Sequence, residues 1–85
     1  MTYRLLYTSR AERDIKKLPP DIKRRIGQTL LRYKQAPHDY SETLADTKLG
    51  TYRFRIGDYR VIFDIDGNEI IVLRVGHRRD IYRRL

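Results

Sequence analysis

Arginines alternate with large apolar residues in one short stretch of this 85-residue chain. Side chains on a strand point to alternate faces, so Arg53 and Arg55 share one face, about 7 Å apart. A tight Gly57-Asp58 turn then leads into a second strand, which adds Arg60. Guanidinium groups on a rigid strand suit phosphate oxygens, which they bind in bidentate fashion. The pattern therefore indicates a sheet that binds RNA, with RNA cleavage as a further hypothesis.

The opposite face of the same strands carries apolar side chains. We expect three of them in the protein core: Tyr52, Phe54 and Ile56. Tyr59 and Phe63 are also assigned to packing rather than to stacking on bases.

The end of the chain supplies two groups that can transfer protons. Tyr82 lies among several arginines, and nearby cations favour the ionised form of a phenol; alternatively its ring stacks on a base. His77 titrates near neutrality, although it directly follows a predicted strand and has an equally simple structural role. We prefer Tyr82 for proton transfer and keep His77 as the second candidate.

Other cations have two interpretations each. Arg60 binds phosphate or pairs with Asp58 or Asp64 on the surface, and the arginines at 53 and 55 bind RNA or contact only a protein partner. Five further cations are candidates for RNA binding, with a solvated helix face or a frayed tail as the alternative: Lys23, Arg24, Arg79, Arg83 and Arg84.

The overall composition favours a nucleic-acid-binding protein. The net charge is +8, and a strongly basic domain attracts nucleic acid or an acidic protein. Seven tyrosines offer rings for stacking on bases. The chain has no cysteine, which is compatible with a reducing cytoplasm, and no signal peptide or membrane-length apolar run is evident. No cluster of His, Asp and Glu has metal-ligand spacing, so we expect neither a metal nor a cofactor.

Periodicity predicts one small domain, residues 1–85, with the order β-α-α-β-β-β. A strand over 3–7 precedes a helix opened by a capping box, Ser9 with Glu12. Pro19-Pro20 separates it from a second helix that ends before Pro37. Residues 37–47 read as irregular, and strands follow at 51–56, 59–66 and 69–75, the last buried on both sides. We expect an α+β fold: a mostly antiparallel four-stranded sheet with a helical hairpin on one face and the other face largely open.

These motifs resemble the RelE/ParE superfamily of toxin–antitoxin toxins. The resemblance rests on the element order, the Lys48-Leu49-Gly50 lead-in, the strand pair YRFRIGDYRVIF and the ending VGHRRDIY. It implies one of two activities. Members of the RelE branch enter the ribosomal A site and cleave messenger RNA, whereas members of the ParE branch poison DNA gyrase. Both branches are held inactive by an antitoxin, here expected to wrap the toxin with an acidic segment.

The resemblance to the RelE branch also implies a catalytic site. Its basic pair, its next-strand arginine, the arginine after the last strand and the C-terminal tyrosine correspond to Arg53, Arg55, Arg60, Arg78 and Tyr82. The best-known members have lysines at the basic pair. Since arginine is effectively never deprotonated in proteins, charge stabilisation carries over and the identity of the general base does not. The implied partners are an antitoxin, messenger RNA on the ribosome and 16S ribosomal RNA. An inactive antitoxin-binding module remains a third alternative.

Overall fold

The computed structural model describes residues 3–45 and 48–83 of the chain. Its five-stranded sheet has the order β1-β5-β4-β3-β2, with β1 parallel to β5 and the other neighbours antiparallel. The predicted α+β class is confirmed. The elements are β1 (Arg4–Tyr7), α1 (Ser9–Lys16), α2 (Pro20–Tyr33), α3 (Pro37–Tyr40), β2 (Ser41–Thr43), β3 (Tyr52–Ile56), β4 (Tyr59–Asp66) and β5 (Glu69–His77).

The fifth strand lies in the segment predicted to be irregular. Residues 37–43 form the short helix α3 and then β2, which pairs antiparallel with β3 at the edge of the sheet. The prediction of four strands was wrong because three polar residues, Ser-Glu-Thr, show no alternation that marks a strand. Asp46 and Thr47 of the same segment lie outside the described residues.

The first helix is capped one residue earlier than predicted. The Thr8 hydroxyl accepts a hydrogen bond from the Ala11 backbone N–H at 3.1 Å, whereas Ser9 is already the first helical residue. The same hydroxyl donates to the Leu73 carbonyl of β5. The Ser9–Glu12 capping box was therefore wrong, because the cap also ties the helix to the sheet and a local pattern does not show that contact.

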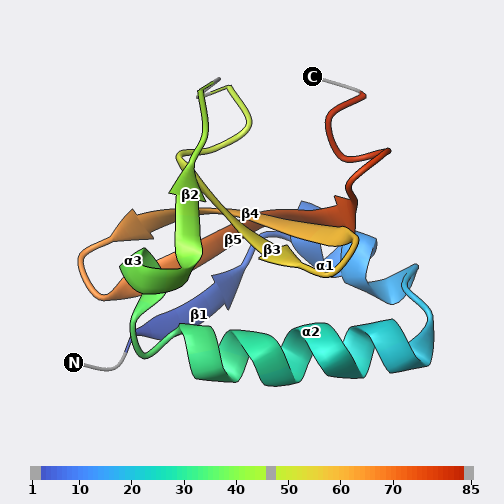
Figure 1. Ribbon diagram of the computed structural model, residues 1–85, viewed down its shortest axis with the longest axis horizontal. Coiled ribbons are helices and arrows are strands. Elements are labelled where there is room, and N and C mark those ends of the chain that lie inside the picture. The colour runs from blue at the N-terminus through green and yellow to red at the C-terminus, as the bar shows by residue number, and fades with distance from the viewer. Residues whose placement is uncertain (1–2, 46–47, 84–85) are drawn as a thin grey trace.

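Helices α1 and α2 cover one face of the sheet and enclose the main core. In Figure 1, α2 runs below the sheet. Phe54 and Phe63 are completely buried there, with ring centroids 4.2 Å apart, and Leu30 of α2 packs in the same core. Tyr52, Tyr59 and Ile56 also pack in or against it, which confirms the apolar face predicted for β3 and β4.

The opposite face is less open than predicted. Ile62, Leu44 and Ile81 form a second, small buried cluster on it. In Figure 1 the C-terminal segment and the β2–β3 connection lie above the sheet. A Cβ at Gly50 would lie 2.8 Å from side-chain atoms of Ile62 and Leu73, so glycine lets this connection pack directly on the strands.

An irregularity in β5 determines which side chains face this second cluster. Consecutive residues Ile62 and Phe63 of β4 pair with Arg74 and Val72, which leaves Leu73 as an extra residue. Such a bulge reverses the alternation of side chains along the strand. Val72 therefore faces the main core and Arg74 the other side. The prediction that β5 is buried on both sides was wrong in part, because Ile70, Val72 and Val75 are buried but Ile71, Leu73 and Arg74 are only partly buried.

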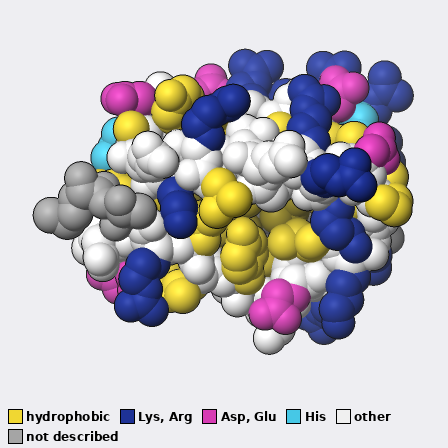
Figure 2. Space-filling view, turned by 90° about the horizontal axis from the view of Figure 1, so that it is seen from below, with side chains coloured by type: hydrophobic (Ala, Val, Ile, Leu, Met, Phe, Trp, Pro, Cys, Tyr) yellow, Lys and Arg dark blue, Asp and Glu magenta, His cyan; other side chains and the backbone are white. Residues whose placement is uncertain are grey.

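Apolar side chains are also exposed on the helix-covered side. Tyr7 of β1 and Leu31 of α2 are at least one-third exposed. Seen from below, hydrophobic side chains gather in the middle of this side, with Lys and Arg around them (Figure 2). Within residues 3–45 and 48–83, no helix is long and apolar enough to cross a membrane.

Candidate functional site

Four arginines meet on the sheet face opposite the helices. Arg55 of β3 lies directly opposite Arg60 of β4, so both side chains project from the same face. Burial lowers the pKa of the Arg60 guanidinium, and repulsion from three neighbouring cations lowers it further. Those cations are Arg55, Arg53 and Arg78. The structure thus brings together all four arginines that the sequence nominated.

Arg60 is the buried member of this group, only 5% exposed. Its Nη1 donates to the carbonyl oxygens of Gly57 at 3.0 Å and Tyr59 at 2.8 Å, which holds the guanidinium over the β3–β4 turn. In the described part of the chain, neither Asp58 nor Asp64 pairs with it. The surface ion pair considered for Arg60 was therefore wrong, and its position is fixed by backbone carbonyls.

Arg78 approaches the same site from the C-terminal segment. Its backbone N–H donates to the Asp58 carbonyl at 2.7 Å, and its Nε lies 3.6 Å from the Asp58 carboxylate. Both side chains are more than half exposed, so the ion pair itself adds little stability. The backbone hydrogen bond is what places Arg78 beside the β3–β4 turn.

Tyr82 contacts the arginine cluster directly. Arg53 Nη1 donates a hydrogen bond to the Tyr82 hydroxyl oxygen at 2.9 Å, and this bond raises the pKa of Arg53. The guanidinium carbon also lies 6.0 Å from the centre of the Tyr82 ring. A hydroxyl that accepts from Arg53 keeps its own proton available to donate. The Tyr82 hydroxyl can therefore donate a proton to a group bound beside the arginine cluster.

The neighbour of Tyr82 anchors the segment that carries it. Ile81 is 2% exposed and packs against Ile62 on the arginine face, and its backbone N–H donates to the His77 carbonyl. A Cβ at Gly76 would lie 3.6 Å from Ile81, an ordinary contact distance, so Ile81 packs directly against the end of β5. The chain after β5 thus folds back over the sheet.

Glu42 belongs to the site and was missed in the sequence. It pairs with Arg53 across β2 and β3, and its carboxylate lies 3.3 Å from Arg53 Nε and 3.7 Å from Arg55 Nε. Carboxylates accept protons, which guanidinium groups do not. No local signal marks Glu42, because its proximity arises only from the pairing of β2 with β3.

His77 lies on the other face of the sheet. It is opposite Tyr59, whose ring packs against the main core, and the two ring centroids are 5.4 Å apart. Its Nδ1 accepts a hydrogen bond from the Arg79 backbone N–H at 3.1 Å. This placement favours a structural role for His77.

The remaining candidate cations are spread over the molecule. Lys23 and Arg24 are exposed on α2, across the sheet from the arginine cluster, and Arg79 is exposed after β5. Arg83 forms a long, exposed ion pair with Asp80 at 3.9 Å. Arg84 lies outside the described residues. Among the residues described, no group of three or more His, Cys, Asp and Glu could hold a metal ion.

Comparison with known proteins identifies the family. A family model described as "ParE toxin of type II toxin-antitoxin system, parDE" matches residues 5–82. The chain belongs to this toxin family. Toxin RelG of Mycobacterium tuberculosis is 36% identical over 87 residues, covering 99% of this chain and all of the relative. Toxin RelE3 of Methanocaldococcus jannaschii is 30% identical over 84 residues, covering 93% and 94%.

A solved structure agrees with this membership. The chain is similar to a protein in the crystal structure of the toxin–antitoxin complex RelBE2 from Mycobacterium tuberculosis, with a TM-score of 0.83 and 31% identity. The match covers 92% of this chain and all of that one. The resemblance to the RelE/ParE superfamily is thus confirmed, and the protein is a toxin of the type II toxin–antitoxin class.

Proposed function

We propose that this toxin is a ribosome-dependent endoribonuclease that cleaves messenger RNA in the A site and so inhibits translation. The observation that carries this proposal is the hydrogen bond from Arg53 to Tyr82 within a cluster of four arginines. Two relatives named RelG and RelE3 support the RelE-like assignment.

The proposed reaction uses a nucleophile that RNA itself supplies. The 2′-oxygen attacks the adjacent phosphorus, the bond to the 5′-oxygen breaks, and the products are a 2′,3′-cyclic phosphate and a 5′-hydroxyl. The protein must align the two oxygens and stabilise the negative charge that grows on the phosphorane. Arginines fixed on neighbouring strands meet this demand, and the chemistry needs no metal ion or organic cofactor.

Proton transfer is assigned to the two groups that flank Arg53. Its Nε faces Glu42 and its Nη1 donates to Tyr82, so a base and an acid lie on opposite sides of one guanidinium. Attacking and leaving oxygens lie roughly in line across a phosphorus undergoing substitution. In this scheme Glu42 accepts the proton of the 2′-hydroxyl and Tyr82 gives its proton to the departing 5′-oxygen.

We also propose the partners of the toxin and the compartment in which it acts. Such a toxin works in the cytoplasm, where it meets messenger RNA and 16S ribosomal RNA. An antitoxin partner is supported by the similarity to a protein solved in a toxin–antitoxin complex. The net charge of +8 favours an acidic antitoxin segment that covers the basic face.

Inhibition of DNA gyrase is the second candidate function. It is favoured by the ParE description of the matching family model. A ParE-like toxin would act by binding protein and would need neither Glu42 nor the Tyr82 hydroxyl.

Expression without an antitoxin separates these functions. We expect growth to stop and incorporation of labelled methionine to fall before incorporation of labelled thymidine, because translation is the target. An earlier fall of thymidine incorporation would instead support the gyrase function. Unchanged growth at a verified protein level would show that the chain is an inactive antitoxin-binding module.

A further inference from the structure

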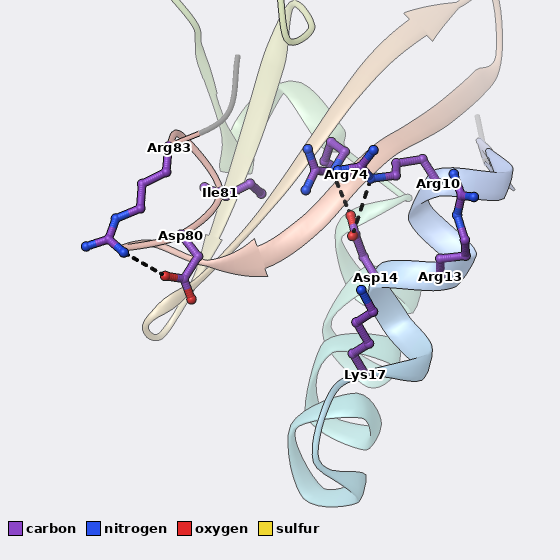
Figure 3. Close-up of a pocket in the computed structure, with 8 residues that line it drawn as sticks. All are labelled: Arg10, Arg13, Asp14, Lys17, Arg74, Asp80, Ile81 and Arg83. Carbon is purple, nitrogen blue, oxygen red and sulfur yellow. Dashed lines mark hydrogen bonds and ion pairs between the residues drawn. The ribbon is translucent and has the colours of Figure 1, made fainter.

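A second basic site lies at the edge of the same sheet face. A cavity of about 540 Å³ opens between α1, β5 and the C-terminal segment. In Figure 3, α1 contributes Arg10 and Arg13 and its C-cap contributes Lys17 from one side, and the C-terminal segment contributes Arg83 from the other. With Arg74 of β5, five cations line the cavity against the two carboxylates of Asp14 and Asp80.

Asp14 is already used by the protein and orients the cavity wall. Its Oδ2 accepts hydrogen bonds from Arg74 Nε at 2.8 Å and from the Val75 backbone N–H at 3.0 Å (Figure 3 shows the bond to Arg74). Arg10 lies 3.9 Å from its other oxygen. The Asp14 side chain is only 12% exposed. Its carboxylate therefore anchors Arg74 against α1 and is largely shielded from a ligand in solution.

Two cations of the cavity have no side-chain partner among the residues that the structure describes. For the described residues, the structure records no ion pair or side-chain hydrogen bond for Arg13 of α1 or for Lys17, which caps the C-terminus of α1, and both are exposed. Cations four residues apart on a helix repel each other unless an anion lies between them. Because both side chains are exposed and have no recorded partner among the described residues, their charged head groups are available to bind an anion.

The cavity continues the arginine cluster along one face. Arg74 is opposite Ile62, and Ile62 is opposite Arg53. The backbones of Arg74 and Arg53 are therefore two strand spacings apart, about 10 Å. Ile81 lines the cavity, and the next residue, Tyr82, contacts Arg53. A bound RNA strand can therefore reach both sites across the C-terminal segment.

We propose that this cavity is a separate phosphate-binding subsite for the RNA that the toxin engages, held by Arg13, Lys17 and Arg74. This inference rests on the proposed function and adds a site away from the cleavage chemistry. Phosphate is favoured because Ile81 lines the cavity and the next residue, Tyr82, contacts Arg53, so a strand bound at the proposed cleavage site continues into the cavity. Binding of an antitoxin carboxylate instead is an outcome of the test. Its occupant is a phosphate of either the message or the ribosomal RNA.

The test measures binding to ribosomes without allowing cleavage. Ribosomes carry either no message or a message with a 2′-O-methyl group at the A-site codon, and dissociation constants are measured at several salt concentrations. Losing one phosphate contact reduces the slope of log affinity against log salt by about 0.7–0.9. We expect this reduction for Arg13→Gln with Lys17→Gln, and recovery of the slope for Arg13→Lys with Lys17→Arg.

The matched control removes two charges elsewhere. Arg4→Gln with Lys16→Gln changes the net charge equally, with one residue on α1 and one on β1, outside the cavity. The proposal is overturned if the control loses as much slope as the cavity variant, or if neither loses any. It is also overturned if the cavity variant loses affinity only for the antitoxin. A loss on both ribosome samples identifies ribosomal RNA, and a loss only with message identifies messenger RNA. If the parental toxin does not bind ribosomes, the proposed function fails as well.

Discussion

Arg53 contacts both groups that can move a proton in the site. Glu42 lies on the Nε side and Tyr82 on the Nη1 side, at 3.3 Å and 2.9 Å. A guanidinium in this position stabilises charge and orients its neighbours, but it neither accepts nor gives up a proton. In the proposed mechanism Arg53 therefore stabilises charge, whereas Glu42 and Tyr82 transfer protons.

Replacing Tyr82 by phenylalanine removes the proton and keeps the ring. We expect single-turnover cleavage on programmed ribosomes to fall by about a hundredfold, the lower end for general acid–base help, with ribosome affinity little changed. Tyr82→Ala serves as the comparison, because it removes the ring as well. Parental cleavage by Tyr82→Phe together with a defect only in Tyr82→Ala would make the tyrosine a stacking platform.

Replacing Glu42 by glutamine tests the proposed base. The amide keeps the shape of the side chain but cannot take a proton, so we expect cleavage to fall by about a hundredfold. Ribosome affinity should hold or rise, because Arg53 and Arg55 lose a competing anion. Glu69→Gln is the control, since Glu69 is ion-paired to Arg4 at the other edge of the sheet. Cleavage at the parental rate by Glu42→Gln would remove Glu42 from the mechanism.

Sequence reasoning found the site residues that lie on regular strands. Strict alternation placed Arg53 and Arg55 on one face, and the structure pairs Arg55 with Arg60 as a tight hairpin requires. It did not find Glu42, which reaches the site through a three-residue strand. It also left His77 as a candidate, because the face of a residue at a strand end depends on the register and bulge before it.

The elements were predictable where the chain carries clear signals. β4 spans Tyr59–Asp66 as predicted, and a proline pair separates the two main helices. The missed features depend on contacts between distant segments. The bulge at Leu73 and the packing of Gly50 over Ile62 are set by tertiary structure, which local periodicity does not encode.

The C-terminal segment is the element that completes the site. Ile81→Ala should destabilise the fold by roughly 2–5 kcal/mol, the usual cost of emptying a buried aliphatic position. It should also lower cleavage, because the backbone that holds Tyr82 against Arg53 loses its anchor. Denaturant unfolding measures the loss of stability. Single-turnover cleavage, measured under conditions where the variant remains folded, tests the effect on activity.

Ile81→Val is the matched control for that experiment. It should cost only about 0.5–1.5 kcal/mol and retain near-parental cleavage. Full cleavage by folded Ile81→Ala would show that Tyr82 is positioned without this anchor.

The two faces of the sheet carry different kinds of side chain. One side of the sheet buries the main core under α1 and α2, and the other carries the arginine cluster with its C-terminal segment. A net charge of +8 gives the protein a long-range attraction to RNA, which salt screens. In the proposed function, the overall charge brings RNA to the surface, whereas cleavage depends on the few side chains held around Arg53.

The most direct measurement is the chemistry of the cut ends. Purified toxin is added to ribosomes programmed with a defined message, and the fragments are mapped and their termini identified. We expect cleavage in the A-site codon only when ribosomes are present, with a 2′,3′-cyclic phosphate upstream and a 5′-hydroxyl downstream. An intact message, or fragments with 5′-phosphate ends, would contradict the proposed attack by the 2′-hydroxyl.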